Sequence, residues 1–128
     1  MKVLYVEDTQ LLREAVSERL KLEGHEVVTA ENAKDGLQQF YMDQPELGLV
    51  ITDVDLGVGM TGIEFADKIV SQNDWDVNKI LIVSGDPENI ALAGSKGYQA
   101  LSKGDTTFTS YLLKAVEVLS RLSPAAVS

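Results

Sequence analysis

The chain has 128 residues, of which 45% are hydrophobic, which is enough for one globular domain with its own core. It has no cysteine, which excludes disulfides and zinc–thiolate sites, and no apolar run approaches the ~20 residues needed to span a bilayer. The net charge of −9 argues against nucleic-acid binding by this domain, and the N-terminus turns acidic too early for a signal peptide, so we expect a soluble cytoplasmic protein without membrane contact.

Five short apolar runs are spaced along the chain. Three of them are rich in valine and isoleucine and lack clean polar alternation, as is typical of strands buried in a parallel sheet. We therefore predict strands at residues 3–6, 26–30, 48–52, 80–84 and 99–102.

Helical repeats of apolar residues separate and follow these runs. Asn32 precedes the second repeat as a cap candidate, and Asp105 and Thr106 precede the last one. A weaker helix is predicted within 86–97, with Asp86 as its cap. The apolar stripes of the other four helices are Leu12, Val16 and Leu20; Ala33, Leu37, Phe40 and Tyr41; Ile63, Ala66, Ile69 and Val70; and Phe108, Leu112, Ala115, Val116, Leu119 and Leu122.

The order of these elements is βαβαβαβαβα. Such alternation predicts a doubly wound α/β fold, in which a five-stranded parallel sheet carries helices on both faces. We expect one domain over residues 1–122, followed by a tail or the start of a linker at 123–128. In folds of this kind, ligands bind beyond the carboxyl ends of the strands.

Polar residues follow four of the predicted strands. Glu7 and Asp8 follow the first strand, and Asp53 with Asp55 follows the third. The pair at 84–85 (Ser-Gly) ends the fourth strand, and the pair at 103–104 (Lys-Gly) ends the fifth. All of these residues are expected at the same edge of the sheet.

Their chemistry suits phosphoryl transfer. Clustered carboxylates attract a hard divalent cation such as Mg²⁺, which prefers oxygen ligands. An aspartate beside the metal can attack a phosphoryl group, while the metal and a lysine neutralise the charge on the phosphoryl oxygens. Asp8, Asp53, Ser84 and Lys103 supply these groups from four strands.

These residues give the sequence a resemblance to the receiver domain of two-component response regulators. It covers about residues 1–122, and Gly62 with Glu64 resembles the Gly-x-Glu that opens the third helix in that family. The resemblance implies a flavodoxin-like (βα)5 fold with strand order 2-1-3-4-5. It also implies a signalling domain rather than an enzyme. Such a domain catalyses only its own phosphorylation and dephosphorylation.

The resemblance also implies a role for each carboxylate. Asp53 would accept a phosphoryl group from a sensor histidine kinase or a histidine phosphotransfer protein. Asp8 and Asp53 would bind Mg²⁺, together with the backbone carbonyl of Asp55, and Glu7 would act largely through water.

The remaining residues at the sheet edge would act on the phosphoryl group. Lys103 would pair with its oxygens and Ser84 would donate a hydrogen bond to it. Asp86 and Gly85, beside Ser84, would modulate the site, and the side chain of Asp55 would affect the lifetime of the phosphoryl group. Phosphorylation would change the arrangement of the fourth helix, fifth strand and fifth helix, and this conformational change would reach an output partner or domain that the sequence does not identify. The resemblance also implies that two copies of the chain could form a homodimer through the fourth and fifth helices.

Three positions depart from the pattern of that family. Ala100 stands where the fifth strand usually carries an aromatic switch residue, and Tyr98 is the candidate substitute. Gly104 and Gly57 stand where the family usually has proline, and the loop that leads to Gly62 is one residue longer.

Two alternatives remain open at the level of sequence. The motif DVDLG at 53–57 is similar to the DxD motif of haloacid-dehalogenase-type phosphatases, although that motif normally opens the first strand of the core and here it ends the third. The second alternative is a pseudo-receiver that only docks to partners without phosphorylation. The full acidic set argues against it, while Ala100 and Gly104 keep it open. Multiple turnover of a phosphomonoester in the presence of Mg²⁺ separates the phosphatase from the main interpretation. Phosphorylation of Asp53, or Asp53-dependent binding of a phosphoryl mimic, separates the pseudo-receiver from it.

Overall fold

In the computed structural model, which describes residues 1–104 and 107–122, strands and α-helices alternate along the chain. The elements are β1 (Lys2–Val6), α1 (Gln10–Leu22), β2 (Glu26–Ala30), α2 (Ala33–Asp43), β3 (Leu47–Asp53), α3 (Gly62–Asn73), β4 (Ile80–Ser84), α4 (Pro87–Ser95), β5 (Gln99–Ser102) and α5 (Phe108–Leu122). Two short 3-10 turns, η1 (Gln44–Glu46) and η2 (Val77–Lys79), precede β3 and β4.

The five strands form one parallel sheet in the order β2-β1-β3-β4-β5. The predicted fold class and strand order are therefore confirmed. Three registers matter for the site: Val6 pairs with Thr52, Asp53 with Val83, and Ser84 with Ser102. The ends of β1, β3, β4 and β5 consequently lie level with one another at one edge of the sheet.

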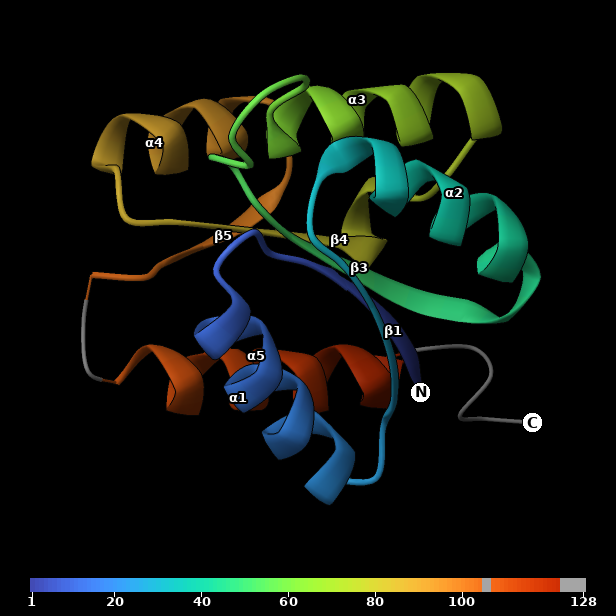
Figure 1. The fold of residues 1–128 in the computed structure, drawn as a ribbon, viewed down its shortest axis with the longest axis vertical. Helices are drawn as coiled ribbons and strands as arrows, with labels where there is room; N and C mark the ends of the chain where they lie inside the picture. The colour runs from blue at the N-terminus through green and yellow to red at the C-terminus, as the bar shows by residue number, and fades with distance from the viewer. Residues whose placement is uncertain (105–106, 123–128) are drawn as a thin grey trace.

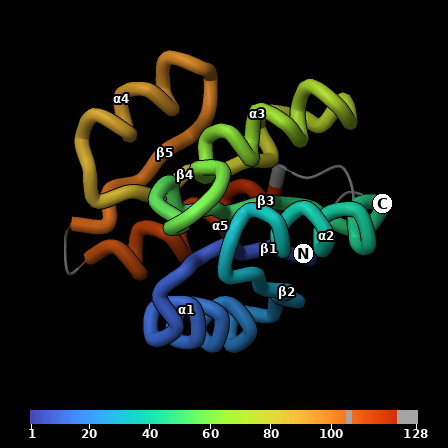
Figure 2. The backbone as a smooth tube through the Cα atoms, turned by 45° about the horizontal axis from the view of Figure 1, so that its top comes forward, coloured from blue at the N-terminus to red at the C-terminus, as the bar shows by residue number. Residues whose placement is uncertain are grey.

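The helices form a layer on each face of the sheet, as Figures 1 and 2 show. Helices α1 and α5 cover one face, and α2, α3 and α4 cover the other. Alternate residues of each strand point to opposite faces, so each layer has its own hydrophobic core. One core contains Val3, Tyr5, Leu49, Ile51, Leu81 and Val83 with α1 and α5, and the other contains Leu4, Val6, Val50, Ile80 and Ile82 with α2, α3 and α4.

Side-chain caps start three of the helices. The predicted caps Asn32 and Asp86 accept hydrogen bonds from the backbone at the starts of α2 and α4, at 2.8 and 2.9 Å. Thr61 and Glu64 form a reciprocal capping box at the start of α3, which the sequence did not predict. Replacing such a cap by alanine typically costs about 1 kcal/mol.

The last predicted features fall partly outside the described residues. The cap candidates Asp105 and Thr106 and the tail at 123–128 lie there, so the proposed domain boundary at residue 122 stays a prediction. Within the described part of the chain, no helix has the length and apolar content needed to cross a membrane.

Candidate phosphorylation site

A cavity of about 430 Å³ opens at the carboxyl edge of the sheet. It is lined by Asp8, Thr9, Asp53, Asp55, Ser84, Gly85, Asp86, Asn89 and Lys103. Every predicted site residue except Glu7 and Tyr98 is in this lining. The sequence did not single out Thr9 or Asn89.

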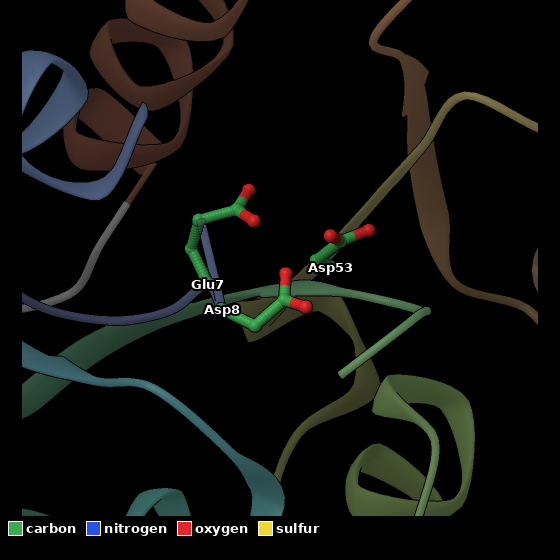
Figure 3. A group of neighbouring side chains, drawn as sticks. All are labelled: Glu7, Asp8 and Asp53. Atoms are coloured by element: carbon green, nitrogen blue, oxygen red, sulfur yellow. The ribbon is translucent and has the colours of Figure 1, made fainter. Parts of the chain in front are cut away.

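Three carboxylates lie close together at this edge of the sheet, and two of them, Asp8 and Asp53, line the cavity. Figure 3 shows Glu7 and Asp8 approaching Asp53 from the end of the neighbouring strand, and one carboxylate oxygen of each lies within 4.8 Å of the others. Glu7 is fully buried and Asp53 is 5% exposed. Partial burial, and then the neighbouring Glu7 carboxylate, raises the pKa of Asp8 above its ordinary value. An all-oxygen donor set of this kind fits a hard divalent cation such as Mg²⁺.

Lys103 is the cation that balances this cluster. Its Nζ lies 2.8 Å from Asp53 Oδ2 and 2.9 Å from Glu7 Oε1. Its backbone N–H donates to the carbonyl of Ser84 at 2.8 Å, which extends the pairing of β4 and β5 beyond the strands and fixes the start of the side chain. Burial by itself would lower the pKa of Lys103, but its hydrogen bonds to Asp53 and Glu7 raise it overall. Lys103 therefore remains an ammonium ion within reach of Asp53.

Glu7 is held by hydrogen bonds on both of its carboxylate oxygens. Besides Lys103, the hydroxyl of Tyr5 donates to Oε1 at 3.3 Å and the backbone N–H of Thr9 donates to Oε2 at 3.2 Å. Arg13 of α1 donates to the carbonyl of Glu7 at 2.8 Å and so fixes its backbone. A fully buried carboxylate needs such partners, because desolvating an isolated charge is very unfavourable.

Tyr5 and Arg13 were not predicted from the sequence. Tyr5 lies two residues before Glu7, so a strand that ends in Glu7 directs both side chains to the same face, and that spacing was an available signal. Burial, and then the negative charge of Glu7, raises the pKa of Tyr5. Its hydroxyl consequently stays protonated and acts as a donor.

Ser84 lies at the end of β4 and lines the cavity. It is 4% exposed, and its Oγ accepts hydrogen bonds from the backbone N–H of Asp86 at 3.0 Å and from Nδ2 of Asn89 at 3.4 Å. Gly85 and Asp86 are exposed at the cavity mouth. The spacing of Asn89 three residues after the cap Asp86 was the signal that could have identified it, because such a residue lies in the first helical turn.

The loop between β3 and α3 contains the predicted metal ligand Asp55. Asp55 is exposed, and its Oδ1 accepts a hydrogen bond from the N–H of Gly57 at 3.3 Å. Gly57 and Gly59 have φ angles of 79° and 101°, a region that favours glycine, and Val58 between them is fully exposed.

The end of this loop lies very close to Asp53. The backbone N–H of Gly62 donates to the carbonyl of Val54 at 2.8 Å, and a Cβ atom on Gly62 would lie 1.8 Å from the carbonyl oxygen of Asp53. Only glycine therefore fits at this position.

Tyr98 lies outside the cavity. It directly precedes β5 and is 7% exposed. Its side chain packs in the core beneath α3 and α4, and the half-buried Ala100 packs against the same core. Its hydroxyl donates to Oδ1 of Asp67 in α3 at 2.6 Å, and the other oxygen of Asp67 pairs with Lys96 at 2.8 Å. Tyr98 thus ties the segment between α4 and β5 to α3.

Comparison with known families identifies the family of this chain. Residues 3–104 match the family described as the response regulator receiver domain. The chain belongs to this family. Membership in the receiver family removes the phosphatase alternative, and the receiver domain is a signalling domain rather than a classical enzyme.

Similar proteins agree with this assignment. A cyclic di-GMP phosphodiesterase of Thermotoga maritima is 30% identical over 119 residues, which are 93% of this chain but 31% of that protein, so the receiver domain spans about a third of its curated relative. A receiver domain protein of Clostridium thermocellum has 25% identity and a TM-score of 0.79, with 92% of each chain covered. A response regulator of Thermotoga maritima, solved with Mg²⁺ and BeF, has 27% identity and a TM-score of 0.77, with 92% of this chain and 97% of that one covered.

Proposed function

We propose that this receiver domain accepts a phosphoryl group on Asp53 and relays a signal by changing conformation. A carboxylate oxygen of Asp53 forms a bond to phosphorus as the bond between phosphorus and the donor's imidazole nitrogen breaks. The donor in this proposal is the phosphohistidine of a sensor histidine kinase or of a histidine phosphotransfer protein. Both partners are inferred from membership of the family.

The contact between Lys103 and Asp53 carries this proposal. The ammonium lies 2.8 Å from Oδ2, although 50 residues separate the two in sequence. It is therefore in place to neutralise charge that develops on a phosphoryl group attached to Asp53. Ser84 lines the same cavity, and its hydroxyl is the proposed neutral donor.

The acidic cluster supports Mg²⁺ as the cofactor. Asp8, Asp53 and the backbone carbonyl of Asp55 are the proposed direct ligands, with Glu7 behind them. Since Glu7 already accepts hydrogen bonds on both oxygens, its proposed contribution is indirect, through water and through its pairing with Lys103. When bound, Mg²⁺ would neutralise part of the charge on the phosphoryl oxygens.

The proposed conformational change passes through α4, β5 and α5. Ala93 is the one residue of α4 that is fully buried, so few apolar contacts hold this helix in place. In place of the aromatic residue usual at position 100, we propose that Tyr98 couples this region to α3. The exposed apolar side chains of Leu92, Tyr111 and Val118 lie on α4 and α5 and are the proposed contact points for an output partner or a second copy of the chain.

Binding of a phosphoryl mimic tests the proposal. With Mg²⁺ present, beryllium fluoride is expected to bind the wild-type domain in isothermal titration calorimetry, and Asp53→Asn is expected to lose this binding. Asp74→Asn is the matched control, because it changes an exposed aspartate outside the cavity. Absence of binding to wild type, or equal binding to Asp53→Asn, would instead favour the pseudo-receiver that docks without phosphorylation.

A further inference from the structure

We propose that Asn89 is a positioning residue, which holds the Ser84 hydroxyl so that its proton points into the cavity. The inference rests on the proposed function, since it concerns how the site receives a phosphoryl group. Neither the match to the receiver family nor the sequence pattern assigns a role to Asn89. Three features of the structure support it: the contacts of the hydroxyl, the place of Asn89 in α4, and the composition of the cavity.

The contacts of Ser84 determine where its proton can go. A serine hydroxyl has two acceptor lone pairs and one proton to donate. In this structure the Oγ accepts one hydrogen bond from the backbone N–H of Asp86 and one from Nδ2 of Asn89. Because both lone pairs are occupied by donors on α4, the proton must be directed away from α4. Ser84 lines the cavity, so an oxygen of a phosphoryl group on Asp53 is the acceptor that this arrangement suits.

The position of Asn89 in α4 explains how it reaches Ser84. Asp86 caps the helix and Pro87 opens it, so Asn89 is the third residue of the first turn. The backbone N–H of the cap residue Asp86 donates to Ser84, and the half-buried Asn89 donates to the same oxygen through its side chain. The first turn of α4 therefore holds Ser84 by one backbone donor and one side-chain donor.

The composition of the cavity makes the direction of this proton important. Asp8, Asp53, Asp55 and Asp86 all contribute carboxylates to the lining, and Lys103 is its one charged donor. A phosphoryl group there needs donors, and a hydroxyl that pointed its proton at α4 would present only a lone pair. Asn89 prevents this outcome, because its amide N–H donates rather than accepts.

Asn89→Asp reverses this hydrogen bond with almost no change of shape. A carboxylate has no proton to donate, so it would accept the proton of Ser84 and divert it from the cavity. The variant is expected to fold, since an acidic residue in the first turn of a helix is favoured by the helix dipole. Asn89→Ala is a second variant, which removes the donor without adding an acceptor. It is expected to lower the affinity for beryllium fluoride less than Asn89→Asp does.

A double-mutant cycle with Ser84→Ala separates the proposed effect from the added charge. The measured quantity is the dissociation constant of beryllium fluoride, with saturating Mg²⁺, by calorimetry. In the Ser84→Ala background, Asn89→Asp acts only through its charge. In the wild-type background it also removes a hydrogen bond to a charged group, so the loss of affinity is expected to be larger by about tenfold or more.

Each result of this cycle bears on the inference. A tenfold excess loss in the presence of Ser84, with unchanged cooperative unfolding of the variants, supports a positioning role for Asn89. An equal loss in both backgrounds, or no loss at all, overturns it while leaving phosphorylation of Asp53 intact. If wild type itself binds no beryllium fluoride, the proposed function fails and this inference fails with it.

Discussion

Lys103 is the residue on which the electrostatics of the cavity depend. It pairs with Asp53 and with the fully buried Glu7, and Glu7 keeps two further donors, Tyr5 and the N–H of Thr9. Lys103 can therefore shift toward a phosphoryl group on Asp53 without leaving Glu7 unpartnered. On the basis of these contacts, we propose that Glu7 acts mainly on the lysine and Asp8 mainly on the metal.

Lys103→Ala is predicted to separate metal binding from binding of the phosphoryl group. Mg²⁺ affinity should be kept or slightly increased, because a cation is removed from beside the carboxylates. Affinity for beryllium fluoride should fall about tenfold or more, since a hydrogen bond to a charged group is lost. Calorimetry of both ligands measures this. Lys34→Ala, which removes an exposed lysine of α2 outside the cavity, should change neither affinity, and a parallel loss in Lys103→Ala and Lys34→Ala would contradict the assignment.

The raised pKa of Asp8 predicts a pH dependence of metal binding. A protonated carboxyl cannot bind Mg²⁺, so affinity should fall as the pH drops through the folded-state pKa of Asp8, which lies above its ordinary 3.8. In metal-free buffer, the free energy of unfolding has the opposite dependence on pH. When folding raises the pKa of a carboxyl, the free energy of unfolding falls as the pH rises from the unfolded-state pKa to the folded-state pKa. Asp8→Asn should therefore weaken Mg²⁺ binding yet raise the free energy of unfolding in metal-free buffer, by at most about 1 kcal/mol.

Titrations of Mg²⁺ at a series of pH values, with denaturant unfolding in metal-free buffer, check both effects. Asp74→Asn, on an exposed loop residue far from the cluster in sequence, serves as the control. Metal affinity that is unchanged in Asp8→Asn would contradict the role given to the acidic cluster.

Among the elements, the start of α3 sets the position of the phosphoacceptor most directly. A methyl group on Gly62 would collide with the backbone of Asp53, which cannot move without disturbing the end of β3. Gly62→Ala is predicted to lower the free energy of unfolding by about 1–3 kcal/mol, as is usual for overpacking. It should also reduce phosphorylation of Asp53.

Gly94→Ala provides the matched control for this substitution. Gly94 lies in α4, where a Cβ meets nothing within 4 Å, so alanine should stabilise the domain by up to about 1 kcal/mol through helix propensity. Thermal and denaturant unfolding measure both changes. A Gly62→Ala variant as stable as wild type would show that the contact with Asp53 is not restrictive.

Tyr98 is the side chain that ties the segment after α4 to α3. Tyr98→Phe keeps the ring in the core and removes the hydroxyl that contacts Asp67. We predict a loss of about 1 kcal/mol in stability, because Asp67 is partly exposed and water can replace the hydroxyl. Hydrogen exchange should speed up in α4 and β5 more than in β1 and β3.

Tyr111→Phe, on the exposed face of α5, is the comparison for this effect. It should change neither stability nor exchange. If Tyr98→Phe also left exchange in α4 unchanged, Tyr98 would not be the coupling residue.

How far each element could be predicted depended on the strength of its local signal. Strands β2, β4 and β5 have the predicted bounds, because turn-forming or polar residues flank each apolar run. The cap of α2 was visible because Asn32 stands directly before an apolar repeat. The capping box of α3 also has a local signal, because Thr61 is followed three residues later by Glu64 before an apolar repeat.

At the scale of the whole molecule, the topology could be predicted better than the contacts. Alternating elements placed Asp8, Asp53, Ser84 and Lys103 at one edge without any knowledge of their side chains. The contacts of Tyr5 and Asn89 could not be predicted in the same way. They depend on which face of a strand or helical turn a side chain occupies and on how closely two elements pack.

Two helices of the same layer, α3 and α4, also differ in how firmly they are held. Helix α3 buries five residues against the sheet, whereas α4 buries Ala93 alone and is tied down by Tyr98 and Lys96 through Asp67. A change at Asp53 is therefore expected to move α4 more readily than α3. Because Ser84 is bonded to the first turn of α4, the cavity and this movable helix share a direct contact.

Phosphorylation of Asp53 is the central claim, and mass spectrometry tests it most directly. The purified domain is incubated with acetyl phosphate and Mg²⁺, and the intact mass is measured before peptides are mapped. One added phosphoryl group, located on Asp53, absent from Asp53→Asn and dependent on Mg²⁺, is the predicted result. An unmodified domain, or equal labelling of the Asp53→Asn variant, would contradict it.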